Sequence, residues 1–195
     1  MVKKTLLTIV AAILWAGSAQ AAPITYTAVL SGANENPPTA STASGFATVI
    51  IDTAANTLSV EVTFQDLTAL ATAAHIHCCV ADPGNAGVAT QTPSFLGFPN
   101  AVSGYYFNVF DTSLDSTFRA GFVTANGGTA EGAEAALALG LADGQAYFNI
   151  HTSTFPGGEI RGFLTRTTTV PEPMTISLLG LGLGAVGMTR RKRRG

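Results

Sequence analysis

The clearest pattern in the chain is a strict alternation of apolar and polar residues across positions 57–65. Leucine, valine, valine and phenylalanine occupy positions 58, 60, 62 and 64, and polar residues stand between them. Side chains of a strand point alternately to its two faces, so this period of two predicts a half-buried β-strand. Apolar or β-branched runs predict further strands at 26–31, 46–51, 73–80, 105–110 and 118–123.

A second alternating stretch, residues 147–162, predicts a hairpin with two different faces. Phe148, Ile150 and Ile160 fall on one face, which we expect to join the apolar core. The turn residues Phe-Pro-Gly-Gly at 155–158 separate the two strands. The opposite face is polar and is the first candidate for a functional site. It carries Asn149, His151, Glu159 and Arg161.

One segment breaks the strand pattern. Residues 131–141 are rich in alanine and leucine, which predicts a short helix that Thr129 caps and that Gly140 or Gly144 ends. Many short strands with turn residues between them and a single helix predict a mainly β fold. We expect one antiparallel β-sandwich with Greek-key-like connections.

The first 21 residues have the three parts of a secretory signal peptide. Lys3 and Lys4 precede an apolar run at 6–16, and Ala-Gln-Ala at 19–21 provides a cleavage site. The apolar run is shorter than the roughly 20 residues that a membrane-spanning helix needs. We therefore expect export, with a mature chain that starts at Ala22.

The last segment, residues 170–195, has a pattern of its own. Pro171, Glu172 and Pro173 precede an apolar, glycine-rich stretch at 174–188, which predicts an apolar helix, and basic residues fill 190–194. At about 1.5 Å per residue this helix is shorter than the roughly 30 Å hydrocarbon core of a bilayer. We interpret it as a transient sorting segment. The chain thus divides into a signal peptide (1–21), one central domain (22–169) and a sorting segment (170–195).

The order of these C-terminal parts resembles the PEP-CTERM sorting signal of Gram-negative bacteria. The resemblance implies that an exosortase-type membrane protease processes the protein near Pro171, Glu172 and Pro173. It also implies a transient anchor in the inner membrane and a final place in the periplasm, on the outer surface or in the extracellular matrix. Such cells usually make exopolysaccharide, which is therefore a candidate partner.

The charge of the central domain differs from that of the whole chain. The whole chain carries a formal net charge of −2, but the central domain keeps only three arginines against eleven acids, a net charge of −8. Nucleic-acid binding needs a basic surface, so we expect no nucleic-acid partner.

Histidines form the strongest chemical signal in the central domain. His75 and His77 stand two apart on a predicted strand, so both imidazoles point to one face. If that strand neighbours the hairpin, His151 completes a set of three imidazoles, which suits zinc or copper. Glu159 is then a fourth ligand or an acceptor for an imidazole N–H. The alternative is a metal-free network in which Glu159 and Arg161 hold the histidines by hydrogen bonds.

Cys78 and Cys79 follow these histidines directly. Thiols of exported proteins are usually oxidised, and adjacent residues of a flat strand face opposite ways. Three interpretations remain: a vicinal disulfide at a strand end, disulfides between molecules, and soft metal ligands beside the histidines. Turn residues at 81–84 end the strand here, which favours the vicinal disulfide.

The central domain as a whole resembles the CHRD domain, a module of chordin-type extracellular proteins that also occurs in exported bacterial proteins. Four stretches carry the resemblance, at 30–38, 44–48, 74–77 and 147–162, and Cys78-Cys79 stands where the family often has Gly-Pro. Membership implies binding or extracellular structure and no settled enzymatic activity.

Two function hypotheses follow. The first is a non-catalytic protein of the cell envelope or matrix, because the chain contains no nucleophile, phosphate-loop or dinucleotide motif. The second is a metal-dependent enzyme or metal-binding protein built on His75, His77 and His151. Its nearest analogy is copper/zinc superoxide dismutase, which is also a β-sandwich with a His-x-His strand but has more histidines.

Overall fold

The computed structural model describes residues 22–167. The predicted signal peptide (1–21) and the sorting segment (170–195), with Pro171, Glu172 and Pro173, lie outside the described residues. Within the described part of the chain, neither helix has the length and apolar character needed to cross a membrane.

The described residues form eight strands, two α-helices and two short 3-10 helices. The strands are β1 (Ile24–Ser31), β2 (Ser44–Asp52), β3 (Thr57–Gln65), β4 (Ala71–Cys78), β5 (Gly104–Asp111), β6 (Ala146–Thr152), β7 (Ile160–Phe163) and β8 (Thr165–Arg166). The helices are η1 (Gly32–Asn34), η2 (Asp115–Thr117), α1 (Ala120–Ala125) and α2 (Ala130–Ala142).

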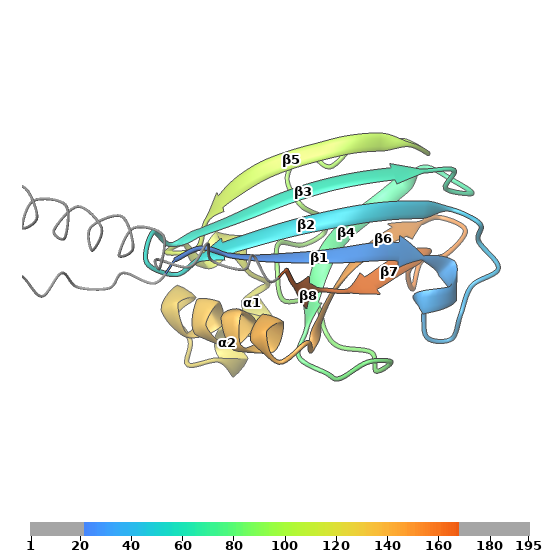
Figure 1. The fold of residues 1–195 in the computed structure, drawn as a ribbon. Helices are drawn as coiled ribbons and strands as arrows, with labels where there is room; N and C mark the ends of the chain where they lie inside the picture. The colour runs from blue at the N-terminus through green and yellow to red at the C-terminus, as the bar shows by residue number, and fades with distance from the viewer. Residues whose placement is uncertain (1–21, 168–195) are drawn as a thin grey trace, which may run out of the picture.

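These strands belong to one antiparallel sheet in the order β4-β6-β7-β1-β2-β3-β5, with β8 beside β1. Figure 1 shows β1, β2, β3 and β5 as one curved layer, with β4, β6 and β7 curling behind it. The sheet therefore has the form of a half-barrel. The prediction of a mainly β, antiparallel fold with few helices is confirmed, whereas the sandwich and its Greek-key-like connections stay predictions.

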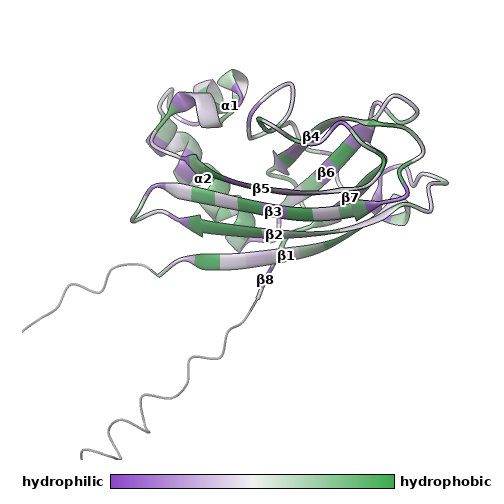
Figure 2. Cartoon of the chain, turned by 90° about the horizontal axis from the view of Figure 1, so that it is seen from above, coloured by the Kyte–Doolittle hydropathy of each residue, from purple (hydrophilic) through white to green (hydrophobic). Residues whose placement is uncertain are grey.

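The alternation along β3 determines which of its side chains fill the curl. Leu58, Val60 and Val62 are fully buried and Phe64 is nearly so, while the residues between them are more exposed. Figure 2 shows the same alternation as bands of hydropathy along β2 and β3. Burying each such side chain contributes about 1.5–3 kcal/mol, so the inner face of this strand strongly favours the observed register.

Phe95, from the loop between β4 and β5, fills the centre of the curl. Its ring centroid lies 5.9 Å from that of Phe148 on β6. The same centroid lies 5.2 Å from that of Phe110 and 6.2 Å from that of Tyr106, and both of these residues are on β5. Phe95 thus packs between the two ends of the sheet. The same loop covers the outer edge of β4, because its backbone amides donate to β4 carbonyls.

The predicted helix is present as α2, and its cap is the predicted one. The hydroxyl of Thr129 accepts a hydrogen bond from the Gly132 N–H at 3.2 Å. Gly144, with a φ of +67°, follows the end of the helix, whereas Gly140 lies inside it. Figure 1 shows α1 and α2 together near one end of the sheet.

The strand predicted at 118–123 is wrong, because this segment leads into α1. Phe118 and Val123 are its buried apolar residues, and Phe122 is half-buried. The spacing of four between Phe118 and Phe122, whose ring centroids lie 6.4 Å apart, suits a helical turn better than the period of two of a strand.

Candidate metal centre

The predicted hairpin is formed by β6 and β7. Its register pairs Asn149 with Arg161 and Ile150 with Ile160. Ile150, Ile160 and Phe148 are fully buried, as the alternation predicts. The polar face is buried as well, since Arg161 is only 1% and Asn149 only 2% exposed. Loops therefore cover this face, and its polar groups need partners within the protein or a ligand.

The pairing of β4 with β6 brings the three histidines together. His75 lies opposite Asn149, and His151 lies opposite Ala73 on the same ladder. The ring centroid of His151 is 5.0 Å from that of His75 and 5.7 Å from that of His77. One ring nitrogen from each histidine lies within 4.8 Å of the other two. We call this group the three-histidine cluster.

Each imidazole of the cluster bonds a backbone carbonyl through one ring nitrogen. The pairs are His75 Nε2 with the Pro93 carbonyl at 2.6 Å, His77 Nδ1 with Ala86 at 2.9 Å, and His151 Nδ1 with Pro156 at 3.0 Å. A carbonyl oxygen can only accept, so these three nitrogens carry the N–H. The lone pair of each neutral ring is therefore on the other nitrogen.

That second nitrogen is buried in all three rings and has no hydrogen-bond partner within residues 22–167. The atoms are Nδ1 of His75, Nε2 of His77 and Nε2 of His151. A buried polar atom without a partner costs about 1–3 kcal/mol, so three in one place need an explanation. Metal-binding imidazoles usually donate their other N–H to a carbonyl or carboxylate. The residues present thus fit a metal ion bound by three lone pairs.

The protonation of the cluster also suits metal binding. Burial lowers the pKa of His75 and of His77 to about 4, although their bonds to carbonyls oppose this shift. Burial lowers the pKa of His151 as well. At neutral pH the imidazoles are uncharged, which is the form that binds metal.

Tyr147 supports the cluster, and it was missed in the sequence. Its hydroxyl accepts the Ala86 N–H at 3.1 Å and donates to the Ala86 carbonyl at 3.3 Å. The same carbonyl accepts the N–H of His77. Alternation along the hairpin places Tyr147 on the face of Asn149 and His151, so this signal was available.

The structure places Glu159 apart from the three-histidine cluster. Its carboxylate accepts hydrogen bonds from the hydroxyls of Ser41, Thr68 and Thr152 and from the Thr68 N–H. Burial raises the pKa of Glu159, but these bonds outweigh that effect and keep the pKa below its usual range. Because both oxygens are bound to hydroxyl and amide donors, Glu159 in this arrangement is neither a metal ligand nor an acceptor for an imidazole.

Arg161 likewise forms a different network from the predicted one. Its Nε lies 3.8 Å from the Glu35 carboxylate, and Glu159 is not its partner. The guanidinium donates to the carbonyls of Asn34 and Pro83 and to Asn85 Oδ1, and these groups belong to the loops above the sheet. Its Cζ atom lies 4.7 Å from the centroid of the Tyr147 ring. Arg161 thus ties the covering loops to β7 instead of binding the histidines.

Cys78 and Cys79 form a disulfide with each other at the end of β4. They therefore offer no thiolate to the cluster. Their sulfur atoms pack against Gly140 of α2.

Comparison with known families matches two parts of the chain. Residues 26–164 match the CHRD domain, and residues 169–194 match the PEP-CTERM protein-sorting motif. Comparisons with curated proteins and with solved structures find no match. The sorting motif indicates an exported protein of a Gram-negative bacterium that is transiently anchored in the membrane and processed by exosortase, a membrane protease. Because the first match spans most of the sequence, the chain belongs to the CHRD domain family.

Proposed function

We propose that this protein is a non-catalytic surface or matrix protein, sorted by exosortase, whose CHRD domain binds one zinc or copper ion. The metal assignment depends on one observation: each histidine of the cluster has a buried ring nitrogen without a hydrogen-bond partner among the described residues, and the three rings offer nitrogens that lie within 4.8 Å of one another. Neutral nitrogen ligands suit zinc and copper, whereas calcium and magnesium prefer oxygen. The sorting motif supports export, and we place the processed protein in the periplasm, on the outer surface or in the extracellular matrix.

The size of the cluster is close to what these ions need. Bonds of about 2.0–2.1 Å to a tetrahedral zinc ion place the nitrogens roughly 3.4 Å from one another. The ring nitrogens now lie within 4.8 Å, so small ring rotations bring them to that distance. The carbonyl acceptors lie on loops, which can follow such a rotation.

Elemental analysis and calorimetric titration of the untagged protein test this proposal. We expect about one equivalent of zinc or copper, lost in His77→Ala and in His151→Ala while circular dichroism still shows a folded sheet. Glu159→Gln is the matched control, because its carboxylate lies outside the cluster; it should keep the metal. A wild-type protein that binds neither ion, or a His77→Ala variant that binds as wild type does, would overturn the assignment.

The number of ligands favours a second candidate function. Three protein ligands leave a fourth position open, which is the arrangement of catalytic zinc sites. A metal-dependent enzyme, such as one resembling copper/zinc superoxide dismutase, therefore merits an assay. Superoxide dismutation by the copper-loaded protein that disappears in His77→Ala would establish catalysis and refute the non-catalytic role.

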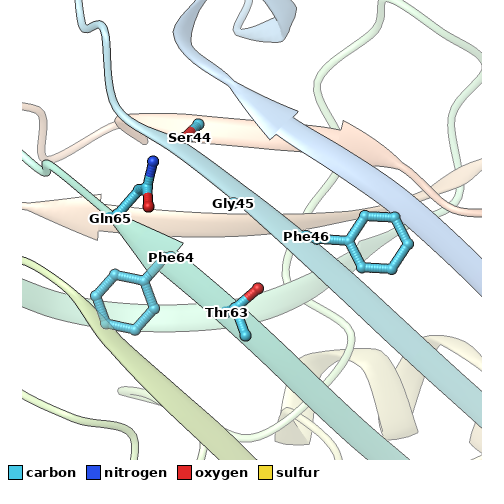
Figure 3. A pocket seen from close by; sticks show the side chains of 6 residues that line it. All are labelled: Ser44, Gly45, Phe46, Thr63, Phe64 and Gln65. Carbon is cyan, nitrogen blue, oxygen red and sulfur yellow. The ribbon is translucent and has the colours of Figure 1, made fainter.

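For the association with exopolysaccharide we propose the outer face of β1, β2, β3 and β5. Its exposed apolar side chains are Val29, Phe46, Tyr105, Phe107 and Val109. Phe46 borders a hollow of about 270 Å³ whose rim carries the hydroxyl and amide groups of Ser44, Thr63 and Gln65. Figure 3 shows Phe46 and Thr63 on the neighbouring strands β2 and β3. Aromatic faces beside neutral hydrogen-bonding groups suit the alternating apolar and hydroxyl surfaces of sugars.

Affinity electrophoresis through gels that contain the polysaccharide of the producing cells tests this surface. We expect retardation of the wild type and its loss in Phe46→Ala and Tyr105→Ala. Leu139→Ala is the control, because Leu139 is also exposed but lies on α2. Equal mobility of wild type and Phe46→Ala would refute the assignment.

A further inference from the structure

Two buried oxygen atoms outside the three-histidine cluster have no hydrogen-bond partner among the described residues. They are Oε1 of Glu35 and Oδ1 of Asn149, on side chains that are 7% and 2% exposed. Both face Gly158, since each lies 2.7 Å from the position that a Cβ atom would take there, and the Asn149 amide nitrogen lies 2.5 Å from the same position. Gly158 has a φ of +129°, which side-chain-bearing residues rarely adopt. The backbone thus keeps a side chain out of the space that the two oxygens share.

A hollow of about 260 Å³ lies beside Glu35 and Gly158, and Asn149 borders Gly158 from behind the lining. Glu35 lines the hollow together with Asn36, Pro37 and Thr39 and with the loop 154–158. Pro37, Phe155 and Pro156 give it apolar walls. Its lining residues include no lysine or arginine. The hollow is therefore apolar along its sides and negative where Glu35 lies.

Arg161 does not satisfy the free oxygen of Glu35. Its Nε is 3.8 Å from Oε2, the other carboxylate oxygen, which is beyond hydrogen-bond distance. Its donors go to the carbonyls of Asn34 and Pro83 and to the side chain of Asn85. Glu35 Oε1 and Asn149 Oδ1 are thus two acceptors that lack a donor, and one of them carries negative charge when ionised.

We propose that this hollow binds a primary ammonium group on a slim apolar stem. An ammonium has three N–H donors and no acceptor. Two of these N–H groups would donate hydrogen bonds to Glu35 Oε1 and Asn149 Oδ1, and the third would donate to water in the hollow. The stem then lies between the proline rings and Phe155. Calcium fits less well, because it needs six to eight oxygen ligands. This site goes beyond the proposed function and does not depend on the metal.

Titration of the full, untagged protein with n-butylammonium at pH 8.5 tests the site. We expect saturable NMR shifts of the Gly157 and Gly158 amides, and none with n-butanol or tetramethylammonium, which lack the ammonium donors. Glu35→Gln should weaken binding about tenfold or more through the loss of a charge-assisted hydrogen bond. Glu61→Gln, which changes an exposed acid on β3, is the control and should bind as wild type does.

The pH dependence gives a second readout. Burial raises the pKa of Glu35 to about 7, although Arg161 and the Asn36 N–H oppose this shift. The ionisable groups around Glu35 are Arg161 on β7, Tyr147 on β6 and Asp82, which lines the adjacent hollow. An alkylammonium stays charged throughout, whereas Glu35 gains a proton as the pH falls below 7. The affinity should therefore fall about 30-fold between pH 8.5 and pH 5.5.

Three results would overturn the proposal: equal binding of n-butanol, unchanged binding in Glu35→Gln, and displacement of n-butylammonium by calcium at lower concentration. Glucosamine and Nα-acetyllysine, titrated in the same way, distinguish an amino sugar from a lysine side chain as the source of the ammonium. Absence of shifts with all three amines would also refute the site.

Discussion

The hydroxyl of Thr152 donates to the carboxylate of Glu159 at 2.6 Å, and neither side chain is exposed to solvent. Ser41 and Thr68 donate to the same carboxylate from two other parts of the chain. Glu159 therefore ties β6 to the loops that precede β2 and β4. This role is structural, and it places Glu159 apart from the three-histidine cluster, to which the shared polar face of the hairpin assigned it.

Glu159→Gln should lower the free energy of unfolding without releasing the metal. The amide removes the charge and turns one acceptor into a donor that faces hydroxyl groups, which costs about 1–3 kcal/mol. Urea denaturation measures the loss, and elemental analysis measures the metal. Loss of the metal at unchanged stability would instead identify Glu159 as a ligand.

Gly140→Ala should destabilise the protein, although alanine normally favours a helix over glycine by about 0.5–1 kcal/mol. A Cβ atom at residue 140 would collide with Cys78 Sγ and lie 2.8 Å from Cys79 Sγ. Such overpacking typically costs about 1–3 kcal/mol. Gly121→Ala in α1 is the matched control, since no heavy atom of the described residues lies within 4 Å of its Cβ position, apart from those of its chain neighbours and its own helix backbone. Thermal denaturation should rank Gly121→Ala above wild type and Gly140→Ala below it; equal melting of the two variants would contradict the contact.

Alternation and apolar runs were sufficient to predict most of the strands, with the segment 118–123 as the exception, and alternation predicted the faces of the side chains on β3 and the hairpin. It placed His75 with His77, and it assigned Ile150 and Ile160 to the core, because the period of two is a local property of the chain. It did not predict that β4 pairs with β6, since strand pairing depends on contacts between distant segments.

The partners of the polar groups were harder to predict than their faces. The acceptors for the imidazoles are backbone carbonyls of Ala86, Pro93 and Pro156, and a backbone group has no residue-type signal. Arg161 lies near Glu35 and not near Glu159, because the segment after β1 folds over the sheet and brings Glu35 to it. Residue type and alternation therefore predicted the three-histidine cluster but not its supporting network.

Acid should destabilise the metal-free protein through the buried histidines. Burial lowers the pKa of His75 and His77 to about 4, against about 6.5 for an unfolded chain. Between these values the unfolded chain binds more protons, so this contribution is complete above pH 6.5 and is lost as the pH falls toward 4. At about pH 4.5 each of these histidines has lowered the free energy of unfolding by about 2–3 kcal/mol.

Urea denaturation of the metal-free protein at pH 7.5 and pH 4.5 measures this loss. Glu159 also contributes less to the free energy of unfolding as the pH falls, because its pKa is lowered in the folded protein. The contribution of Glu35 changes in the opposite direction, because its pKa is raised. Both carboxylates are present in wild type and in His75→Asn, so their contributions cancel when the acid-induced losses of the two proteins are subtracted. We expect a smaller loss in His75→Asn, and equal losses would contradict a lowered pKa for His75.

Tyr147→Phe should weaken metal binding with little loss of stability. The ring of Tyr147 is stacked on that of His77, with centroids 4.8 Å apart and planes 7° from parallel. Phenylalanine keeps this stacking but removes the hydroxyl that fixes Ala86, whose carbonyl orients His77. Loss of such an indirect support lowers metal affinity about tenfold, which zinc titration calorimetry measures.

Tyr106→Phe on β5 is the matched control for this change. The Tyr106 hydroxyl donates to the Leu96 carbonyl at 2.9 Å, and Tyr106 is not part of the network that supports the imidazoles. Tyr106→Phe should lose about 1 kcal/mol of stability from one hydrogen bond, and Tyr147→Phe should lose somewhat more because its hydroxyl forms two, but only Tyr147→Phe should bind zinc more weakly. If the two variants bind zinc equally well, the Tyr147 hydroxyl does not position His77, and stacking alone holds the ring in place.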